Sequence, residues 1–287
     1  MEKMIDWIEL WNELVQAQNC GYAHDQRLDK QDHWRARAKE FDSHVRRRWE
    51  QVDSSRALIV SMLDAIPNAT VLDIGAGTGA WATLLARHAR RVTAIEPSPA
   101  MLEVLRHNLE SEKVTNVEIV AEAWPHARVG IHDFTLCSHA MYGLGDFAQF
   151  IQGIEAVTRQ TIFLLIRAPT MHGVMAEAAR RVWGHPYDSP NYQVALNALL
   201  QMGIFPNVLM EEPGSWEPWV NDSLEDARNQ IKRRLGLSQT SEYDAFLMQL
   251  IQRRLTCVDG KYVWPRATRT ALVYWRAQAE RSERLEA

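Results

Sequence analysis

The pattern of apolar positions changes near residue 70. In the segment before it, apolar residues recur every three or four positions, as they do on the buried face of an amphipathic helix. The turn-rich residues 19–22 separate the first two helical patterns, and Ser54 is available to cap the third. We predict helices over residues 4–18, 32–49 and 54–65.

After residue 70, short runs of β-branched residues alternate with helical patterns, which is typical of parallel strands joined by crossover helices. Strands are predicted over 70–74, 91–95, 117–120, 133–137, 161–166 and 269–275, with a further apolar run at 205–210. Helices are predicted over 80–89, 98–110 and 146–158. The chain is therefore expected to build a doubly wound α/β sheet that binds ligands at the carboxyl ends of its strands.

Helical patterns dominate again beyond Arg167. We predict helices over 171–183, 189–202, 222–235 and 241–255. Because neither a repeat nor a low-complexity linker interrupts this part, we interpret these helices as a lid or cover on the same domain. The expected organisation is an N-terminal helical cover over 1–66 and a core over 67–287, with helical additions at about 171–203 and 222–256.

Composition and charge narrow the class of protein. With 287 residues and 46% apolar side chains, the chain can bury a sizeable core, and it contains no apolar run of about eighteen residues that would span a membrane. The formal net charge of −4 disfavours nucleic acid as a partner. Basic residues do gather over residues 35–48, but acids are interleaved with them, as on a solvated helix face.

The cysteines and histidines indicate the compartment and the metal content. Cys20, Cys137 and Cys257 are odd in number, far apart and outside any CxxC pair, so we predict reduced thiols and a cytoplasmic location. The N-terminal segment lacks the continuous apolar run of a signal peptide. The ten histidines show no tight metal-ligand spacing, so no metal site is predicted.

A glycine-rich segment, Asp73-Ile74-Gly75-Ala76-Gly77-Thr78-Gly79, follows the first predicted strand and precedes a helix. Glycines in this context permit a tight turn and a close approach of the backbone to a ligand. The first two glycines, followed by Ala80, also fit a dinucleotide site, and Glu96 stands where a ribose-binding acid is expected in either case. The loop alone leaves NAD and S-adenosylmethionine (SAM) open. Asp73 favours SAM, because dinucleotide strands usually carry an apolar residue there and an acid can receive an ammonium group.

The segment VLDIGAGTG resembles the first motif of class I SAM-dependent methyltransferases. The similarity continues in Ile95–Met101, which resembles the second-strand acid that holds both ribose hydroxyls, and in Val120–Trp124, which resembles the segment that reads the adenine. In the latter, Glu122 replaces the aspartate usual in the family. Trp34-x-x-x-Ala38-x-x-Phe41-Asp42 resembles the aromatic helix that many small-molecule methyltransferases fold over the cofactor, although ordinary helix packing produces the same spacing.

The resemblance implies a Rossmann-like sheet of seven mostly parallel strands, SAM as cofactor and S-adenosylhomocysteine (SAH) as product. Residues after the fourth strand face the transferred methyl group in this family, which makes His139 the candidate general base and Tyr142 a candidate wall of the acceptor pocket. A histidine that only hydrogen-bonds a loop carbonyl is the alternative interpretation. The cofactor contacts implied are Asp73, Gly75, Ala76, Gly77, Thr78, Gly79, Glu96, Pro97, Met101, Glu122, Ala123, Trp124, Ser138, Trp34 and Phe41.

Absent motifs narrow the acceptor. The chain lacks the Asn/Asp-Pro-Pro-Tyr type of segment that orients amino groups of adenine or glutamine, and Cys137 follows a leucine rather than a proline, so we interpret it as a core residue. Trp216-Glu217-Pro218-Trp219 is open to two interpretations, an apolar acceptor pocket or packing between lid helices. We expect methyl transfer to a small molecule. The alternatives are a tRNA or protein methyltransferase and a non-catalytic SAM-binding protein, while Asp73 disfavours an NAD-dependent oxidoreductase.

Overall fold

The computed structural model describes residues 5–26, 32, 34–212, 216–266 and 268–278. The elements up to the fifth strand are α1 (Trp7–Gln26), α2 (Ala38–Trp49), α3 (Ser54–Asp64), β1 (Thr70–Ile74), α4 (Ala80–Ala86), β2 (Arg91–Ile95), α5 (Pro99–Ser111), β3 (Val117–Val120), β4 (His132–Ser138), the 3-10 turn η1 (Met141–Gly143), α6 (Phe147–Ala156) and β5 (Thr158–Pro169). They are followed by α7 (Val174–Trp183), α8 (Tyr192–Gln201), β6 (Asn207–Met210), β7 (Val220–Asn221), α9 (Leu224–Arg234), α10 (Asp244–Arg254), β8 (Thr256–Val258), β9 (Lys261–Val263) and β10 (Thr268–Arg276).

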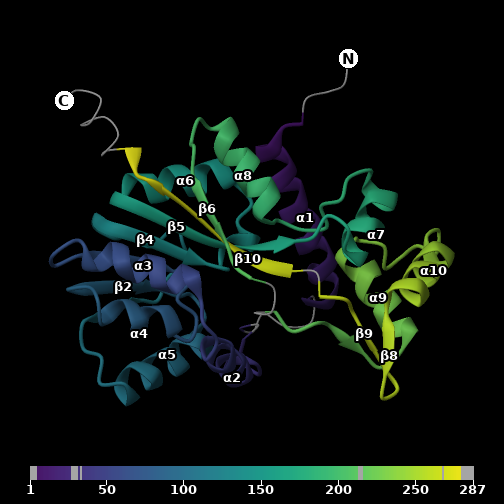
Figure 1. The fold of residues 1–287 in the computed structure, drawn as a ribbon, viewed down its shortest axis with the longest axis horizontal. Coiled ribbons are helices and arrows are strands. Elements are labelled where there is room, and N and C mark those ends of the chain that lie inside the picture. The colour runs from purple at the N-terminus through teal and green to yellow at the C-terminus, as the bar shows by residue number, and fades with distance from the viewer. Residues whose placement is uncertain (1–4, 27–31, 33, 213–215, 267, 279–287) are drawn as a thin grey trace.

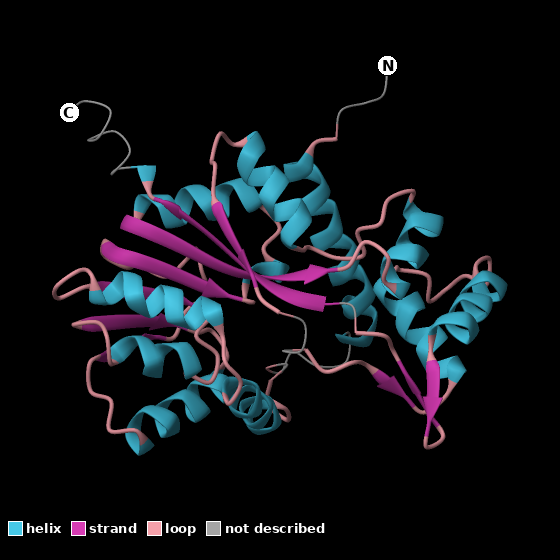
Figure 2. Cartoon of the chain, in the orientation of Figure 1, coloured by secondary structure: helices cyan, strands magenta, loops and turns pink. Residues whose placement is uncertain are grey.

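Seven strands form one sheet in the order β3-β2-β1-β4-β5-β10-β6. Neighbouring strands from β3 to β5 are parallel, and β10 runs antiparallel to both of its neighbours. Helices cover both faces of the sheet (Figure 1, Figure 2). The predicted α/β architecture, a doubly wound and mostly parallel sheet of seven strands, is therefore confirmed. The chain order reverses at β1, which lies between β2 and β4, so the loops after these strands meet at one edge.

Alternation along the central strands divides the core between the two faces. Ile162, Leu164 and Ile166 of β5 pack with α1, α6 and α8, whereas Phe163 and Leu165 pack with α3, α4 and α5 on the other face. All five side chains are buried. A strand with apolar residues at every position is what burial on both faces requires, and the unbroken apolar run of β5 in the sequence reflects it.

The residues beyond β5 are shared between the sheet and a separate lobe. The helix α8 packs on the sheet with α1 and α6. The helices α7, α9 and α10, with the three-stranded sheet β7-β9-β8, surround a hydrophobic cluster of their own that includes Ile231, Leu247 and Ile251. Figure 1 shows this lobe beside the carboxyl ends of the central strands. The division of the chain at residue 66 stays a prediction.

The structure differs from the sequence-based expectations at several places. The helix α1 continues through residues 19–22 to Gln26, because one glycine inside a helix costs only about 1 kcal/mol and no proline interrupts it. The N-cap of α3 is Asp53 rather than Ser54, and its carboxylate accepts a hydrogen bond from Arg56 N at 2.8 Å.

The third difference is the hairpin β8–β9, in a segment where no strand was predicted. Its turn residues Asp259 and Gly260 have φ of +50° and +77°. Asp-Gly between two short strands is a strong signal for a tight hairpin turn, so the sequence does contain the signal that would have identified it.

Glu211, directly after β6, connects the sheet to the start of α3. Its carboxylate is 8% exposed and accepts a hydrogen bond from Ser54 N at 3.2 Å and others from the backbone N–H and the hydroxyl of Ser55. The N–H groups of a first helical turn have no partner within the helix, and a carboxylate also suits the positive end of the helix dipole. Glu211, which is 156 residues from Ser55 in the sequence, therefore satisfies free N–H groups in the first turn of α3.

Glu211→Ala should lower the free energy of unfolding by about 2–3 kcal/mol, because it leaves buried donors at the start of α3 unpaired. Urea denaturation followed by circular dichroism measures the change. Glu212→Ala, at the exposed neighbouring position, is the control and should change this free energy by less than about 0.5 kcal/mol. Equal losses in the two variants would contradict the connecting role of Glu211.

Candidate functional site

The glycine-rich loop leaves the carboxyl end of β1 and leads into α4. Gly75, Gly77 and Gly79 have φ of +73°, +58° and +86°. Residues other than glycine rarely adopt this left-handed backbone conformation. A Cβ atom on Gly75 would lie 2.2 Å from Ala140 Cβ. The loop after β4 therefore packs directly against this glycine, and no larger residue fits there.

Backbone hydrogen bonds hold the loop against the end of β2. Gly75 N and Ala76 N each donate to Ile95 O at 2.9 Å. The next N–H, that of Gly77, donates to Glu96 Oε2 at 2.9 Å. The first two predicted motifs thus lie side by side, as the parallel pairing of β1 with β2 requires.

Asp73 and Glu96 place two buried carboxylates at these strand ends. Asp73 is 1% exposed, and its Oδ2 atom has no hydrogen-bond partner among the described residues. Burial, with the charge of Glu96 as a second cause, raises the pKa of Asp73 to about 7. Burial also raises the pKa of Glu96, although hydrogen bonds from Ser98 N and Gly77 N oppose that shift. A buried acceptor without a donor suits a cationic or hydrogen-bonding ligand.

The predicted aromatic pair lies over the start of α5 and the glycine loop. The rings of Trp34 and Phe41 meet edge to face with centroids 5.1 Å apart, and both pack against the buried Met101. Phe41 Cε1 lies 3.9 Å from the place of a Cβ atom on Gly77. Three segments far apart in the sequence therefore form one apolar wall beside the loop.

Asp32 fixes the position of this wall. The helix predicted from residue 32 begins at Ala38 instead, and the Asp32 carboxylate accepts hydrogen bonds from Ser98 Oγ at 2.7 Å and from Ala100 N at 2.8 Å. It thereby caps α5. No local pattern in the sequence indicates this contact, because Asp32 and Ser98 are 66 residues apart.

Asn108 holds the glycine loop from the opposite side. This residue of α5 is 6% exposed, and its Nδ2 atom donates to Thr78 O at 2.8 Å and to Asp42 Oδ1 at 2.9 Å. Its Oδ1 atom accepts from Arg46 Nη2 at 2.7 Å. Sequence analysis missed this residue, although a buried amide on an apolar helix face must find partners.

The segment Val120–Trp124, which the sequence predicts to contact the adenine, packs less closely against the glycine loop. Pro97, Glu122 and Ala123 are exposed. Trp124 is half-buried and belongs to the cluster on the α6 face, where its Cζ2 atom lies 3.1 Å from the place of a Cβ atom on Gly153. The structure therefore brings Trp34 and Phe41 to the loop, whereas Trp124 packs with α6.

Ser138, His139 and Tyr142 follow one another at the carboxyl end of β4. Ser138 Oγ accepts a hydrogen bond from Trp81 Nε1 at 3.0 Å. His139 has a φ of +56°, and its Nδ1 atom lies 2.8 Å from Tyr142 Oη. Tyr142 Oη in turn accepts from the backbone N of Arg167 at 2.7 Å. The two candidate catalytic residues thus form one hydrogen-bonded chain to β5.

His139 is uncharged at neutral pH. Burial, followed by the charges of Arg48 and Arg167, lowers its pKa to about 3. Burial raises the pKa of Tyr142 to about 12. The tyrosine therefore stays protonated, and its hydroxyl can donate a hydrogen bond to Nδ1 of the neutral imidazole. A base with so low a pKa is a weak proton acceptor, and the geometry favours a hydrogen-bonding role for His139.

Two arginines and a tryptophan surround this pair. The guanidinium carbon of Arg167 lies 4.5 Å from the Tyr142 ring centroid, and that of Arg48 lies 5.3 Å from the Trp216 ring centroid. The Trp216 ring meets His139 edge to face at 5.2 Å. Trp216 was singled out in the sequence as a possible pocket residue, whereas nothing there distinguished Arg48 from the mixed charge run.

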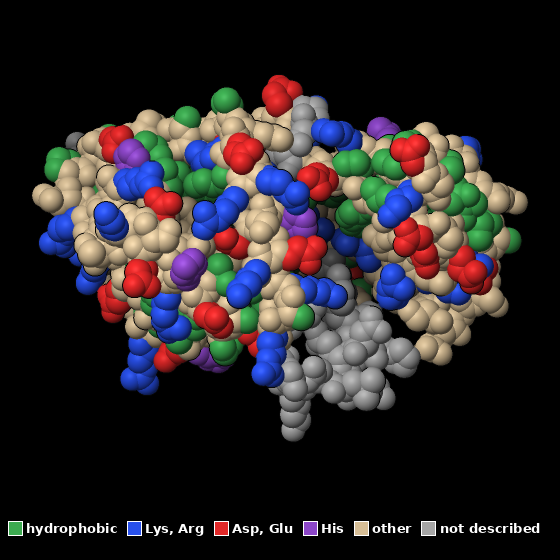
Figure 3. All heavy atoms as spheres, turned by 90° about the horizontal axis from the view of Figure 1, so that it is seen from below, with side chains coloured by type: hydrophobic (Ala, Val, Ile, Leu, Met, Phe, Trp, Pro, Cys, Tyr) green, Lys and Arg blue, Asp and Glu red, His purple; other side chains and the backbone are tan. Residues whose placement is uncertain are grey.

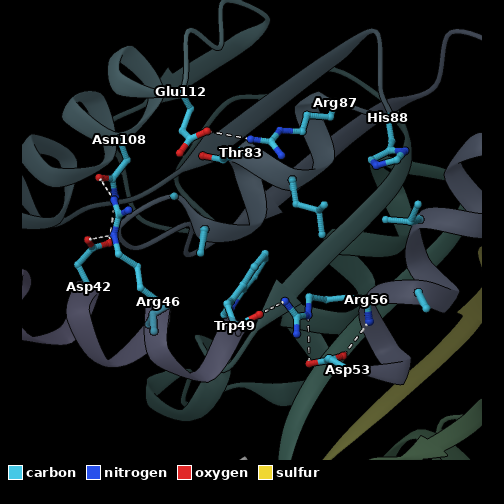
Figure 4. Close-up of a pocket in the computed structure, with 16 residues that line it drawn as sticks. Asp42, Arg46, Trp49, Asp53, Arg56, Thr83, Arg87, His88, Asn108 and Glu112 are labelled. Carbon is cyan, nitrogen blue, oxygen red and sulfur yellow. Dashed lines mark hydrogen bonds and ion pairs between the residues drawn. The ribbon is translucent and has the colours of Figure 1, made fainter. Parts of the chain in front are cut away.

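A cavity of about 550 Å³ lies between α2, α3, α4 and α5 rather than at the strand ends (Figure 4). Its charged side chains satisfy one another, as Arg46 does with Asp42 at 2.7 Å and Arg87 with Glu112 at 2.9 Å. A polar ligand would have to break these pairs. Volume alone therefore does not mark this cavity as the functional site.

The described residues offer few other candidate metal-binding or reactive groups. They contain no group of three or more His, Cys, Asp or Glu placed to hold a metal ion, and none of their helices has the length and apolar character needed to cross a bilayer. Cys137 is buried in the core and Cys257 is exposed, both as free thiols, while the side chain of Cys20 lies outside the described residues. Basic and acidic side chains are interspersed on the face shown in Figure 3.

Comparison with known proteins identifies the segment that holds this site. Residues 71–161 match the family model described as a methyltransferase domain. The match runs from β1 into β5 and includes the glycine loop, Glu96 and His139.

Individual relatives resemble parts of the chain. A probable ribosomal RNA small subunit methyltransferase A of Methanosphaera stadtmanae is 36% identical over 70 residues, 24% of this chain and 26% of that protein. A ubiquinone biosynthesis O-methyltransferase of Acinetobacter baylyi is 32% identical over 92 residues, 31% of this chain and 39% of that protein. The crystal structure of the YcgJ protein of Bacillus subtilis has a TM-score of 0.49 and 15% identity, over 77% of this chain and 96% of that one. The chain thus matches well under half the length of these two curated relatives.

Asp73→Asn should remove a pH-dependent cost of folding. The folded protein holds the Asp73 proton up to about pH 7, whereas an unfolded chain releases it near the ordinary pKa of 3.8. The folded state binds more protons in this window, so this carboxyl group lowers stability as the pH rises from about 4 to 7. Relative to the variant, the wild type should lose on the order of a few kcal/mol between pH 5 and pH 8.

Urea denaturation at pH 5, 6, 7 and 8 measures this difference. Asp222→Asn, at a side chain that is 81% exposed, is the control and should follow the wild type. A constant difference between the wild type and Asp73→Asn at every pH would show that burial does not raise the pKa of Asp73.

Proposed function

Residues 71–161 carry a class I SAM-dependent methyltransferase domain, and from that premise we propose that this protein transfers the methyl group of SAM to a small-molecule acceptor. The observation that carries the proposal is the buried Asp73 oxygen, which has no hydrogen-bond partner among the described residues and lies beside a glycine loop with positive φ angles. Glu96 on the next strand and the wall formed by Phe41 and Met101 complete the cofactor site proposed here.

The residues present fit SAM better than a dinucleotide. SAM supplies a methyl group on a positively charged sulfur, and its methionine part carries an ammonium group. Asp73 Oδ2 is suited to bind that ammonium, because it is a buried anionic acceptor with no donor of its own. Glu96 accepts two backbone N–H groups, and a carboxylate has about four acceptor positions, so it can also receive ribose hydroxyls. A pyrophosphate would instead meet the negative charge of Asp73 without a cation.

The residues after β4 orient the acceptor in this proposal. Methyl transfer depends mainly on aligning a nucleophile behind the methyl carbon and on excluding water. The chain from His139 through Tyr142 to Arg167 N fixes three polar groups at the strand ends. Because His139 is neutral and a weak base, we assign it to positioning, and the best acceptor is one that needs no strong general base.

A small acceptor is favoured over a macromolecule by the surface and by a second cavity. Charges of both signs are interspersed on the face shown in Figure 3, so this face gives nucleic acid no continuous basic path. A cavity of about 110 Å³ lies between the sheet and the lobe. The names of the two curated relatives point to different acceptors, since one names ribosomal RNA and the other ubiquinone biosynthesis.

The free thiols of Cys137 and Cys257 suit the cytoplasm as the compartment.

Isothermal titration calorimetry with SAM, and separately with NADH, tests the cofactor. SAM should bind with a micromolar Kd, and Asp73→Asn and Glu96→Gln should each weaken binding by about tenfold or more, because each removes a charge-assisted hydrogen bond. Glu110→Gln, exposed on the same α5 that follows Glu96, should leave the Kd unchanged. Binding of NADH in place of SAM, or SAM binding indifferent to both substitutions, would overturn the proposal.

Turnover separates the enzyme from a non-catalytic SAM-binding protein. The enzyme should convert SAM to SAH when small nucleophiles are supplied, whereas a binding protein should retain SAM unchanged under the same conditions. Retained binding without SAH formation across amine, thiol and hydroxyl acceptors would favour the binding protein.

A further inference from the structure

The cavity of about 110 Å³ lies between the carboxyl ends of the sheet and the lobe. Its lining includes Trp216, Trp219 and Trp264 and three basic residues, Arg167, Arg234 and Arg266. Trp219 and Trp264 meet edge to face at 5.1 Å. Figure 3 shows a hollow between the main body and the lobe with Lys and Arg side chains along it.

Among the described residues, Arg167 has no ion-pair partner. Its guanidinium contacts the Tyr142 ring at 4.5 Å, and its Nη2 atom donates to the neutral hydroxyl of Ser189 over a long 3.4 Å. Its Nε atom is buried and has no hydrogen-bond partner among the described residues. A buried guanidinium N–H without an acceptor costs free energy that a bound anion would recover.

The nearby carboxylates do not neutralise this charge. Asp188 is 5% exposed and lies 3.3 Å from Arg234 Nε, so it is committed to that second arginine. Arg234 also stacks on Trp219 at 4.9 Å. Glu217 is exposed and makes no ion pair among the described residues. The positive charge of Arg167 therefore remains uncompensated beside the cavity.

We propose that this cavity is the acceptor subsite, and that it takes a small organic anion whose carboxylate pairs with Arg167 while its apolar part contacts Trp216 and Trp264. This inference rests on the proposed methyl transfer and names the class of acceptor. A guanidinium presents paired N–H donors that match a carboxylate, and the aromatic wall suits a flat or branched apolar group.

The size and position of the cavity fit such an acceptor. A dry apolar cavity of ~150 Å³ accommodates benzene, so this cavity of about 110 Å³ takes an apolar group smaller than one ring or a ring that protrudes from its open side. The cavity also borders the residues that end β4, because Trp216 contacts the His139 ring and Arg167 contacts the Tyr142 ring. Trp216 is fixed in turn by a hydrogen bond from its Nε1 atom to Thr270 Oγ1 at 3.0 Å.

A matched pair of probes tests the charge requirement. Benzoate and benzamide have the same ring and nearly the same shape but differ in charge. Each is titrated into the full chain with saturating SAH, and binding is followed by saturation-transfer NMR. Benzoate should bind with a Kd at least tenfold lower than that of benzamide, and Arg167→Met should remove this preference.

Arg159→Met is the matched control, because Arg159 lies on the same strand with a side chain that is 60% exposed. It should bind benzoate as the wild type does. Equal affinity of the wild type for both probes, no binding of either, or unchanged benzoate binding by Arg167→Met would overturn the proposal. If Arg167→Met does not fold, the comparison of the two probes on the wild type still decides.

Calorimetry with SAM on the same preparations separates this proposal from the one on which it rests. SAM binding without a benzoate preference refutes only the anionic acceptor. If the wild type does not bind SAM, the proposed methyl transfer itself is refuted. Arg167→Met should bind SAM as tightly as the wild type, because Asp73 and Glu96 supply the proposed cofactor contacts.

Discussion

Two carboxylates at the end of an apolar sheet are the constraint around which this protein is arranged. Asp73 lies one residue before the end of β1 and Glu96 directly follows β2, two neighbouring strands whose side chains are mostly buried, and burial raises the pKa of both carboxylates. Glu96 is compensated by backbone N–H groups from the glycine loop and from the start of α5. Asp73 Oδ2 is not compensated within the described residues. The buried Asp73 carboxylate lowers the stability of the folded protein by itself, and a bound cationic ligand would offset this cost.

The segments that surround these carboxylates come from distant parts of the sequence. Asp32 caps α5, Phe41 reaches Gly77, and Asn108 holds Thr78. Through these contacts, residues before β1, which supply no strand, help to position the glycine loop and α5. They limit the freedom of the loop from both sides, so the backbone that faces the ligand is positioned before binding.

The sequence predicts the fold and the position of the glycine loop well, for physical reasons. The unbroken apolar run of β5 and the segment from Asp73 to Gly79 are local patterns, and both appear in the structure where they were expected. Contacts made by Asp32 or Asn108 depend on residues brought together by folding, and no short-range pattern encodes them. The same holds for Arg167, whose isolation from carboxylates is a property of its surroundings. The hairpin β8–β9 was not predicted, although Asp259-Gly260 is a local signal for its tight turn.

The lobe has a hydrophobic cluster separate from the two that hold the sheet together. Walls of the second cavity come partly from this lobe, through Arg234 and Trp264, and partly from the sheet, through Arg167. Mutations in the lobe can therefore accumulate without disturbing the packing beneath the glycine loop. Under the proposed function, the acceptor that the protein recognises can therefore change over evolutionary time while the residues around the glycine loop stay constant, because part of the acceptor contacts belongs to a separate hydrophobic cluster.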